Sequence, residues 1–171
     1  CGREKEADSL AARLDKAITD LGAITRRSKS RRRVFFCVWP QPLLTIGKSS
    51  FLNHAVTICG GTNIASSLNT PYPHFTIEKL LLADPDVVIL PHEARGQKML
   101  KRFPWTALRA SKTKRLYFLP PASEDALSRP TPRIIDGLYW LSQRIHPELE
   151  AELKNWRAQW KAPDTDQERG G

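Results

Sequence analysis

The sequence predicts a three-layer α/β/α lobe, in which a small, mostly parallel sheet lies between two layers of helices. Short apolar segments alternate with amphipathic segments along the chain, and this alternation favours parallel strands with helices on both faces. The 171 residues suffice for one buried core, and a composition of 40% hydrophobic and 26% charged residues is that of a globular chain. A long amphipathic segment before the first strand adds a helix that leads into the lobe.

The first helix and the first strand are marked by different apolar patterns. Apolar residues recur at spacings of three and four between Ala7 and Leu21, so one face of this helix must lie against another part of the protein. Residues 34–39 are apolar, β-branched or aromatic and are followed by Pro40. This segment predicts a buried strand that enters a rigid loop.

Caps and turn residues place the remaining elements. Thr76 is suited to cap a short helix through Ala83, and the apolar residues 87–90 then predict a second strand. The other expected elements are a helix between a cap at Ser49 or Ser50 and the Gly60-Gly61 pair, a helix around residues 96–103, a strand at residues 116–119, a helix opened by Thr131-Pro132, and a last helix from Pro147.

The net charge of +9 is concentrated near the start of the chain. Residues 1–33 carry ten Lys and Arg against five Asp and Glu, whereas residues 34–171 carry seventeen against thirteen. The cations at residues 26–33 are typical of a solvated helix end, and they suit the carboxyl pole of the helix dipole. A nucleic-acid-binding module is the alternative, but no aromatic side chains interleave with these cations. We therefore expect no nucleic-acid partner.

Residues typical of catalysis or metal binding are present without a supporting motif. None of the four histidines stands in a hydrolase pattern, and the chain has neither a P-loop nor a dinucleotide-binding glycine fingerprint. His92 and Glu93 are adjacent, so in a strand they would point to opposite faces rather than share a metal. We expect no enzyme, no catalytic residue, no metal and no catalytic cofactor. The alternative, an α/β hydrolase-like enzyme, requires a His beside a Ser or Asp in a cleft.

Two proline-stiffened aromatic loops are the candidate ligand-binding segments. The first contains Trp39, Pro40, Gln41 and Pro42 and follows a strand, at the edge where α/β sheets place their ligands. Trp39 suits a core position under this loop equally well. In the second, prolines flank Tyr72 on both sides. Two such rims predict a site for a large, flat or apolar ligand.

Two charged residues have both a structural and a functional interpretation. Glu78 falls in the first turn of its helix, where the helix dipole favours a carboxylate, but an exposed anion there also suits docking on a basic partner. Arg129 precedes Pro130-Thr131-Pro132 and stands at a loop edge, where it meets either a polar ligand group or solvent.

Taken in order, several segments resemble one family of transport proteins. They are VFFCVWPQPLLTIGKSSFLN, ICGGTNIA, PYPHFTIEKLLLADPDVVIL, FPWTALRASKTKRLYFLP and SRPTPRIIDGLYWL. Together, from Arg33 to about Pro147, they resemble the C-terminal lobe of the periplasmic cobalamin-binding proteins of vitamin B12 importers, within the helical-backbone solute-binding proteins that also include siderophore and haem receptors.

The resemblance implies half of a two-lobe protein. Members have two α/β lobes joined by one long helix, and they hold the ligand between the lobes. Residues 1–32 would be the connecting helix and a basic linker, residues 33–162 the C-terminal lobe, and residues 163–171 a polar tail. The expected protein is a periplasmic monomer that captures cobalamin or a related corrinoid and delivers it to the permease of an ABC importer. A ferric siderophore or haem is the alternative ligand.

The resemblance also implies roles for individual residues. The segment Trp39–Leu43, Tyr72 and Arg129 would face the corrin ring, and Glu93 would line the cleft. Glu78 would dock on arginines of the permease, so that the membrane is reached only through that partner. The sequence departs from the family at two places. Tyr72 stands where the best-known cobalamin binder has tryptophan, and Ser142 falls near the place of the cysteine that would pair with Cys59, while a Cys37–Cys59 pair stays open.

Overall fold

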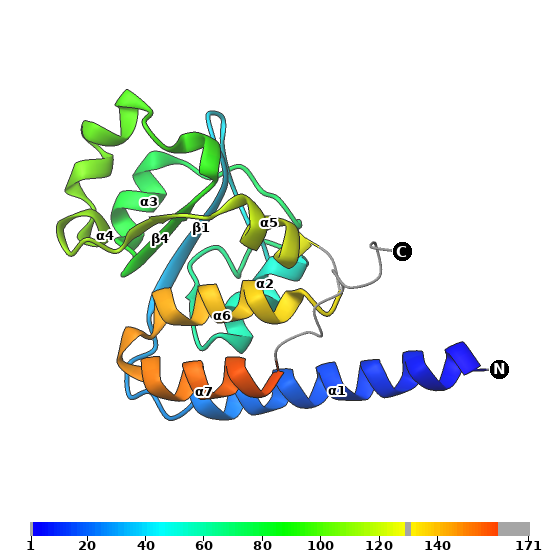
Figure 1. The fold of residues 1–171 in the computed structure, drawn as a ribbon. Helices are drawn as coiled ribbons and strands as arrows, with labels where there is room; N and C mark the ends of the chain where they lie inside the picture. Colours follow the sequence, from blue (N-terminus) through cyan, green and yellow to red (C-terminus); the bar gives the residue numbers. More distant parts are fainter. Residues whose placement is uncertain (1, 129–130, 161–171) are drawn as a thin grey trace.

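In the computed structural model, which describes residues 2–128 and 131–160, a small sheet forms the middle layer (Figure 1). Strands pair in parallel in the order β1-β4-β5, and β3 pairs in parallel with the start of β1. β2 pairs with the end of β1 as an antiparallel hairpin. The described strands are β1 (Arg33–Pro40), β2 (Leu43–Thr45), β3 (Thr62–Asn63), β4 (Val87–Leu90) and β5 (Leu116–Phe118). The predicted small, mostly parallel sheet is confirmed.

Helices cover both faces of this sheet. Val34 and Phe36 of β1 point into a core shared with α1, α2, α5, α6 and α7. Phe35 and Cys37 point into a second core on the side of α3 and α4. The three layers are therefore as predicted (Figure 1). The helices are α1 (Gly2–Thr25), α2 (Phe51–Ile58), α3 (Ile77–Ala83), α4 (Arg109–Lys112), α5 (Pro121–Ser128), α6 (Ile134–Ile145) and α7 (Glu150–Trp160), with 3-10 turns η1 (His92–Ala94), η2 (Lys98–Lys101), η3 (Trp105–Ala107) and η4 (Pro147–Leu149).

The two halves of α1 have different surroundings. Its second half packs against α7, where Ala17 and Leu21 are buried and the indole N–H of Trp156 donates to the Ala17 carbonyl oxygen over 2.9 Å. Residues 4–13 are exposed, and Figure 1 shows this half running past the lobe. The apolar stripe of α1 is thus covered by the lobe only over its second half.

The predicted caps are present. The Ser50 hydroxyl accepts the Leu52 backbone N–H at the start of α2, and the Thr76 hydroxyl accepts the Lys79 N–H at the start of α3. Gly60 follows α2 with a φ of +75°, and a Cβ there would lie 2.7 Å from Nε2 of His146. Glycine is therefore required at this position on both conformational and steric grounds.

The prediction of a helix around residues 96–103 is wrong. Gly96 has a φ of +85°, and residues 92–107 form the separate 3-10 turns η1, η2 and η3. Phe103 precedes Pro104, which disfavours helical backbone at Phe103, so the conformation of Gly96 and this proline restrict a helix at both ends of the segment. The rigid loop expected after Pro40 is instead the turn of the β1-β2 hairpin. Helix α6 has Arg133 rather than Thr131 at its cap position.

The cysteines of the lobe are free and buried. Cys37 and Cys59 belong to cores on opposite faces of the sheet, so they do not pair. Burial raises the pKa of each thiol to about 12. The Cys59 thiol donates to the Leu138 carbonyl oxygen over 3.5 Å, and the nearby Ser142 side chain opposes the effect of burial on its pKa. Ser142 thus lies beside Cys59, where the resemblance expects a cysteine partner.

Candidate functional site

A cavity of about 150 Å³ lies at the carboxyl ends of β1 and β4. Parallel sheets collect their ligands at this edge, because the loops that follow the strands converge there. The walls are mostly apolar, with one carboxylate, one hydroxyl and one phenol among them. The residues that line it include Val38, Tyr72, Pro91, Glu124, Leu127 and Ser128.

Tyr72 is the predicted site residue that the structure places on this cavity. Its side chain is 52% exposed, so the ring is available to a ligand. The flanking backbone is held by the Gly47 N–H, which donates to the Pro71 carbonyl oxygen over 2.9 Å, and by the Thr45 N–H, which donates to Pro73 over 3.1 Å. The backbone on both sides of the ring is therefore fixed by hydrogen bonds to the segment 45–47.

Glu124 is a cavity residue that the sequence analysis missed. Burial raises the pKa of this carboxyl group, the nearby negative charge of Glu93 raises it further, and His92 acts in the opposite direction. The carboxyl group is therefore suited to hydrogen bonding with a polar ligand group. It was missed because α5 was not predicted, although Pro121 at the first helical position and an acid in the first turn are typical of a helix start.

The segment Trp39–Pro42 forms the end of β1 and the hairpin turn, and it does not line the cavity. Trp39 lies at the end of β1, is 47% exposed, and donates its indole N–H to the Gln41 carbonyl oxygen over 2.9 Å. The ring is therefore no core residue, and its neighbour Val38 is the residue that lines the cavity. Pro40 is buried, whereas Gln41 and Pro42 are exposed at the hairpin turn. These four residues stand beside the cavity as a hairpin rather than forming its wall.

The remaining predicted residues fall into three groups. Glu93 is exposed on η1 and acts on the cavity through its charge, without lining it. Arg129 lies outside the described residues, but the preceding Ser128 lines the cavity.

Glu78 is exposed on α3, which covers one face of the sheet, and Leu82 one turn further along α3 is 86% exposed. Glu78 and Leu82 thus form a separate surface on α3.

The hydrolase alternative has little support in the geometry. His146 is 1% exposed, its Nδ1 lies 2.9 Å from Oε1 of Glu148, and its Nε2 lies 3.2 Å from the Gly60 carbonyl oxygen. Both ring nitrogens are engaged, so neither is left to activate a nucleophile. Within residues 2–128 and 131–160, no three His, Cys, Asp or Glu side chains gather as a metal site.

Comparisons with known proteins point to transport. No family model matches the chain. An uncharacterized ABC transporter substrate-binding lipoprotein of Bacillus subtilis is 29% identical over 154 residues, which are 88% of this chain and 48% of that protein. A vitamin B12-binding protein of Vibrio cholerae is 28% identical over 106 residues, which are 62% of this chain and 37% of the relative.

A solved structure agrees with these relatives. The crystal structure of the periplasmic vitamin B12-binding protein of Vibrio cholerae superposes with a TM-score of 0.68 and 26% identity, over 86% of this chain and 54% of that one. The chain is similar in sequence and fold to substrate-binding proteins of ABC transporters. It spans about half the length of these proteins or less.

The relationship is broader than one ligand. A periplasmic haem-binding protein from Roseiflexus has a TM-score of 0.70 at 19% identity, over 85% of this chain and 57% of that one, which shows the shared fold alone. The relatives carry names of binding proteins rather than of enzymes, in agreement with the non-enzymatic role expected from the sequence.

Proposed function

We propose that this chain is the C-terminal half of a substrate-binding protein that captures cobalamin, or a related corrinoid, for an ABC importer. The observation that carries the proposal is the apolar cavity at the carboxyl edge of the sheet, with Tyr72 on its rim. A fold shared with a vitamin B12-binding protein supports the same assignment.

At about 150 Å³ the cavity suits one apolar edge of a larger flat ligand that carries polar groups at its margin. The Tyr72 ring offers an aromatic face to the ligand, and the walls around Val38 and Leu127 exclude water. Glu124 accepts a hydrogen bond from an amide of the ligand, and Arg129 supplies a further polar contact. The hairpin with Trp39 and the carboxylate of Glu93 flank the ligand. Because the rim is held by backbone hydrogen bonds before binding, little ordering cost opposes capture.

The domain boundaries in this proposal are those expected from the sequence. Residues 1–32 are the connecting helix and basic linker, residues 33–162 the lobe, and residues 163–171 a polar tail. The uncovered half of α1, residues 4–13, supports a first lobe that packs there and completes the binding site.

Delivery uses a different surface from capture. Glu78 docks on cations of the permease, and the exposed side chain of Leu82 adds an apolar contact beside it. In the described parts of the chain, no helix combines the length and apolar character required to cross a bilayer. The protein in this proposal works as a periplasmic monomer and meets the membrane through its permease.

The test is a titration of the complete two-lobe protein with cyanocobalamin, followed by tryptophan fluorescence. Haem and a ferric siderophore are titrated in parallel. Saturable binding of cyanocobalamin alone is the expected result. Binding of haem or of the iron chelate without cyanocobalamin would keep the transport role and replace the ligand, and no binding of any of the three would refute the proposal.

A further inference from the structure

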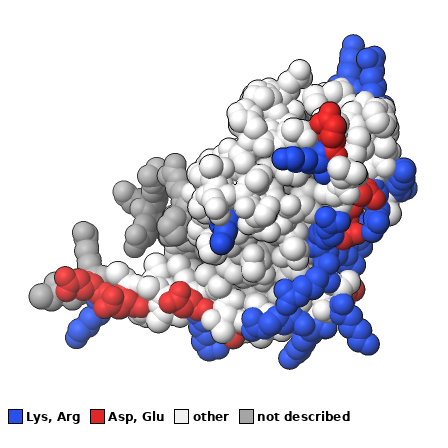
Figure 2. Space-filling model, turned by 180° about the vertical axis from the view of Figure 1, so that it is seen from behind, with Lys and Arg blue, Asp and Glu red and all other residues white. Residues whose placement is uncertain are grey.

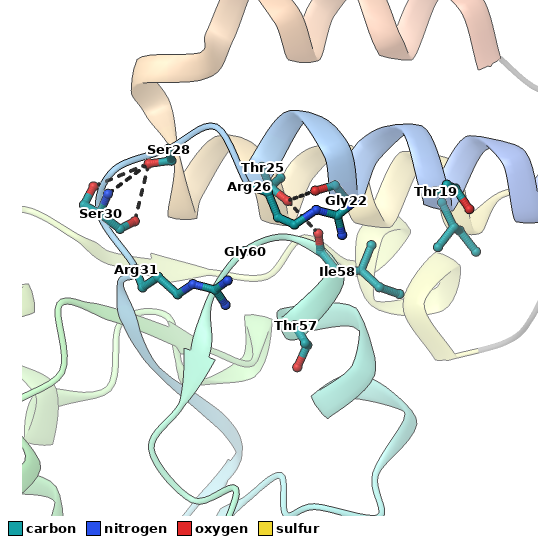
Figure 3. A pocket seen from close by; sticks show the side chains of 11 residues that line it. Thr19, Gly22, Thr25, Arg26, Ser28, Ser30, Arg31, Thr57, Ile58 and Gly60 are labelled. Atoms are coloured by element: carbon teal, nitrogen blue, oxygen red, sulfur yellow. Dashed lines mark hydrogen bonds between the residues drawn. The ribbon is translucent and has the colours of Figure 1, made fainter.

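We infer that a second cavity, where α1 ends, binds a phosphate or sulfate group. This cavity measures about 350 Å³ and lies between the end of α1, the segment before β1 and the turn after α2 (Figure 3). The lining residues that would contact the anion are Thr19, Arg26, Ser30 and Arg31. The inference does not rest on the proposed transport function.

Two guanidinium groups line this cavity without an acidic partner. Arg26 comes from the end of α1, and a Cβ on Gly22 would lie 3.4 Å from its Nη1, so the guanidinium lies along the helix. Arg31 reaches the cavity from the segment before β1 (Figure 3). Among the described residues, no ion pair or side-chain hydrogen bond engages Arg26 or Arg31. Figure 2 shows Lys and Arg gathered around this end of α1, whereas acidic side chains follow its beginning.

Acceptors beside the cavity wall are already engaged by other residues. Glu148, which lies close by, is bound by Arg32 over 2.8 Å, by Ser28 over 2.8 Å and by His146 over 2.9 Å. The carbonyl oxygens at the end of α2 also have partners. The Thr25 hydroxyl donates to the Ile58 carbonyl oxygen over 3.0 Å, and Nε2 of His146 lies 3.2 Å from the Gly60 carbonyl oxygen. Among the described residues, the two exposed guanidinium groups thus have no acidic partner.

The wall also offers hydroxyl groups beside the cations. The Ser28 hydroxyl already donates to Glu148, but the Ser30 hydroxyl lies 3.5 Å from it, and the Thr19 hydroxyl has no hydrogen-bond partner among the described residues. A guanidinium fork matches the oxygens of a tetrahedral anion, and hydroxyl donors complete its shell. No aromatic side chain lines the cavity, so it lacks the stacking platform that a nucleic acid strand uses. A single oxyanion is the ligand that fits.

The experiment compares two double variants of equal charge. Arg26→Gln with Arg31→Gln removes the cavity cations, whereas Arg27→Gln with Lys29→Gln removes two exposed cations of the same segment that do not line the cavity. Binding of inorganic phosphate and of sulfate is measured by calorimetry on the complete protein at constant ionic strength. We expect the first pair to weaken binding by about tenfold or more, and the second pair to change it by less than about twofold.

A second arm separates a free anion from a lipid headgroup. Vesicles of phosphatidylglycerol and phosphatidylcholine replace inorganic phosphate, and a selective loss in the Arg26/Arg31 pair with vesicles alone would assign the site to headgroups. An equal loss in both pairs, or no binding of either probe to the wild-type protein, would overturn the inference.

Two controls keep the result interpretable. Both variants should bind cyanocobalamin as the wild-type protein does, so a failure of the transport proposal is seen separately. In the wild-type protein, phosphate should shift the NMR signals of the Arg26 and Arg31 Nε–H groups more than those of Arg27. Equal shifts of all three would contradict a built site, whatever the stability of the variants.

Discussion

The two ends of this lobe are built on opposite principles. At the carboxyl edge of the sheet, apolar side chains and the Tyr72 ring surround a cavity that has the partly buried Glu124 in its wall. At the end of α1, a network around Glu148 joins the linker, α2 and η4 through charged hydrogen bonds. In the two proposals, the first region binds its ligand by shape and burial and the second by charge, so substitutions should affect the two functions separately.

Filling the first cavity should have the largest effect. Val38→Trp adds an indole to a wall of the 150 Å³ space, and we expect cyanocobalamin affinity to fall by about 100-fold because the ligand and the new ring compete for the same volume. The same tryptophan at Leu82, which is 86% exposed on α3, is the control and should leave affinity unchanged. Equal affinities for all three proteins would place the ligand elsewhere.

Removing the charge of Glu148 should weaken the fold without weakening capture. Burial alone would raise the pKa of this carboxyl group, but hydrogen bonds from Arg32 and His146 hold its pKa at about 2. We expect Glu148→Gln to lower the free energy of unfolding by about 1–2 kcal/mol at pH 7, a value reduced for the partial exposure of the group. Urea unfolding measures the change, and Glu150→Gln, at an exposed helical pair with Lys154, is the control.

The stability difference between the wild-type and Glu148→Gln proteins should depend on pH. Because the folded-state pKa of about 2 lies below the ordinary value of 4.5, the stabilisation is present above pH 4.5 and is lost as the pH falls towards 2. Wild-type and Glu148→Gln proteins should therefore converge in stability over this range. A difference that stays constant from pH 7 to about pH 2 would contradict the network as the source of the stability.

Truncating the aromatic rim should have a smaller effect than blocking the cavity. Tyr72→Ala removes one aromatic face, and we expect cyanocobalamin affinity to fall by about tenfold, measured by fluorescence titration. Phe103→Ala is the matched control, because Phe103 is 74% exposed and does not line the cavity. A loss of the same size in both variants would remove Tyr72 from the site.

The smallest effect concerns docking. Glu78→Lys should leave ligand affinity intact and weaken binding to the permease by about fivefold, because one charge–charge contact is inverted at an exposed surface. The measurement is the affinity of liganded protein for permease in detergent or nanodiscs. Equal docking by both proteins would refute the role of Glu78.

The sequence predicted elements where local chemistry decides the structure. Val87–Leu90 is an apolar run between a turn and Pro91, and the strand is found at those residues. Thr76 caps α3 because its hydroxyl satisfies the Lys79 N–H, an interaction within four residues.

The features that the sequence analysis missed depend on contacts between residues far apart in the chain. The two-residue strand β3 exists because Thr62 and Asn63 pair with Arg33 and Val34, about thirty positions away, which no local pattern reports. Glu124 enters the cavity only because α5 folds across the ends of β1 and β4. Trp39 lies beside the cavity with its ring about half exposed, and its neighbour Val38 lines the cavity, which the pattern of residues 34–39 did not distinguish.

The most direct test of the account is a crystal structure of the complete two-lobe protein with cyanocobalamin. The account predicts the corrin at the carboxyl edge of the sheet, with Tyr72 against the ring and Glu124 within hydrogen-bonding distance of a ligand amide. A corrin bound away from this edge, with the cavity around Val38 and Glu124 unchanged, would contradict it.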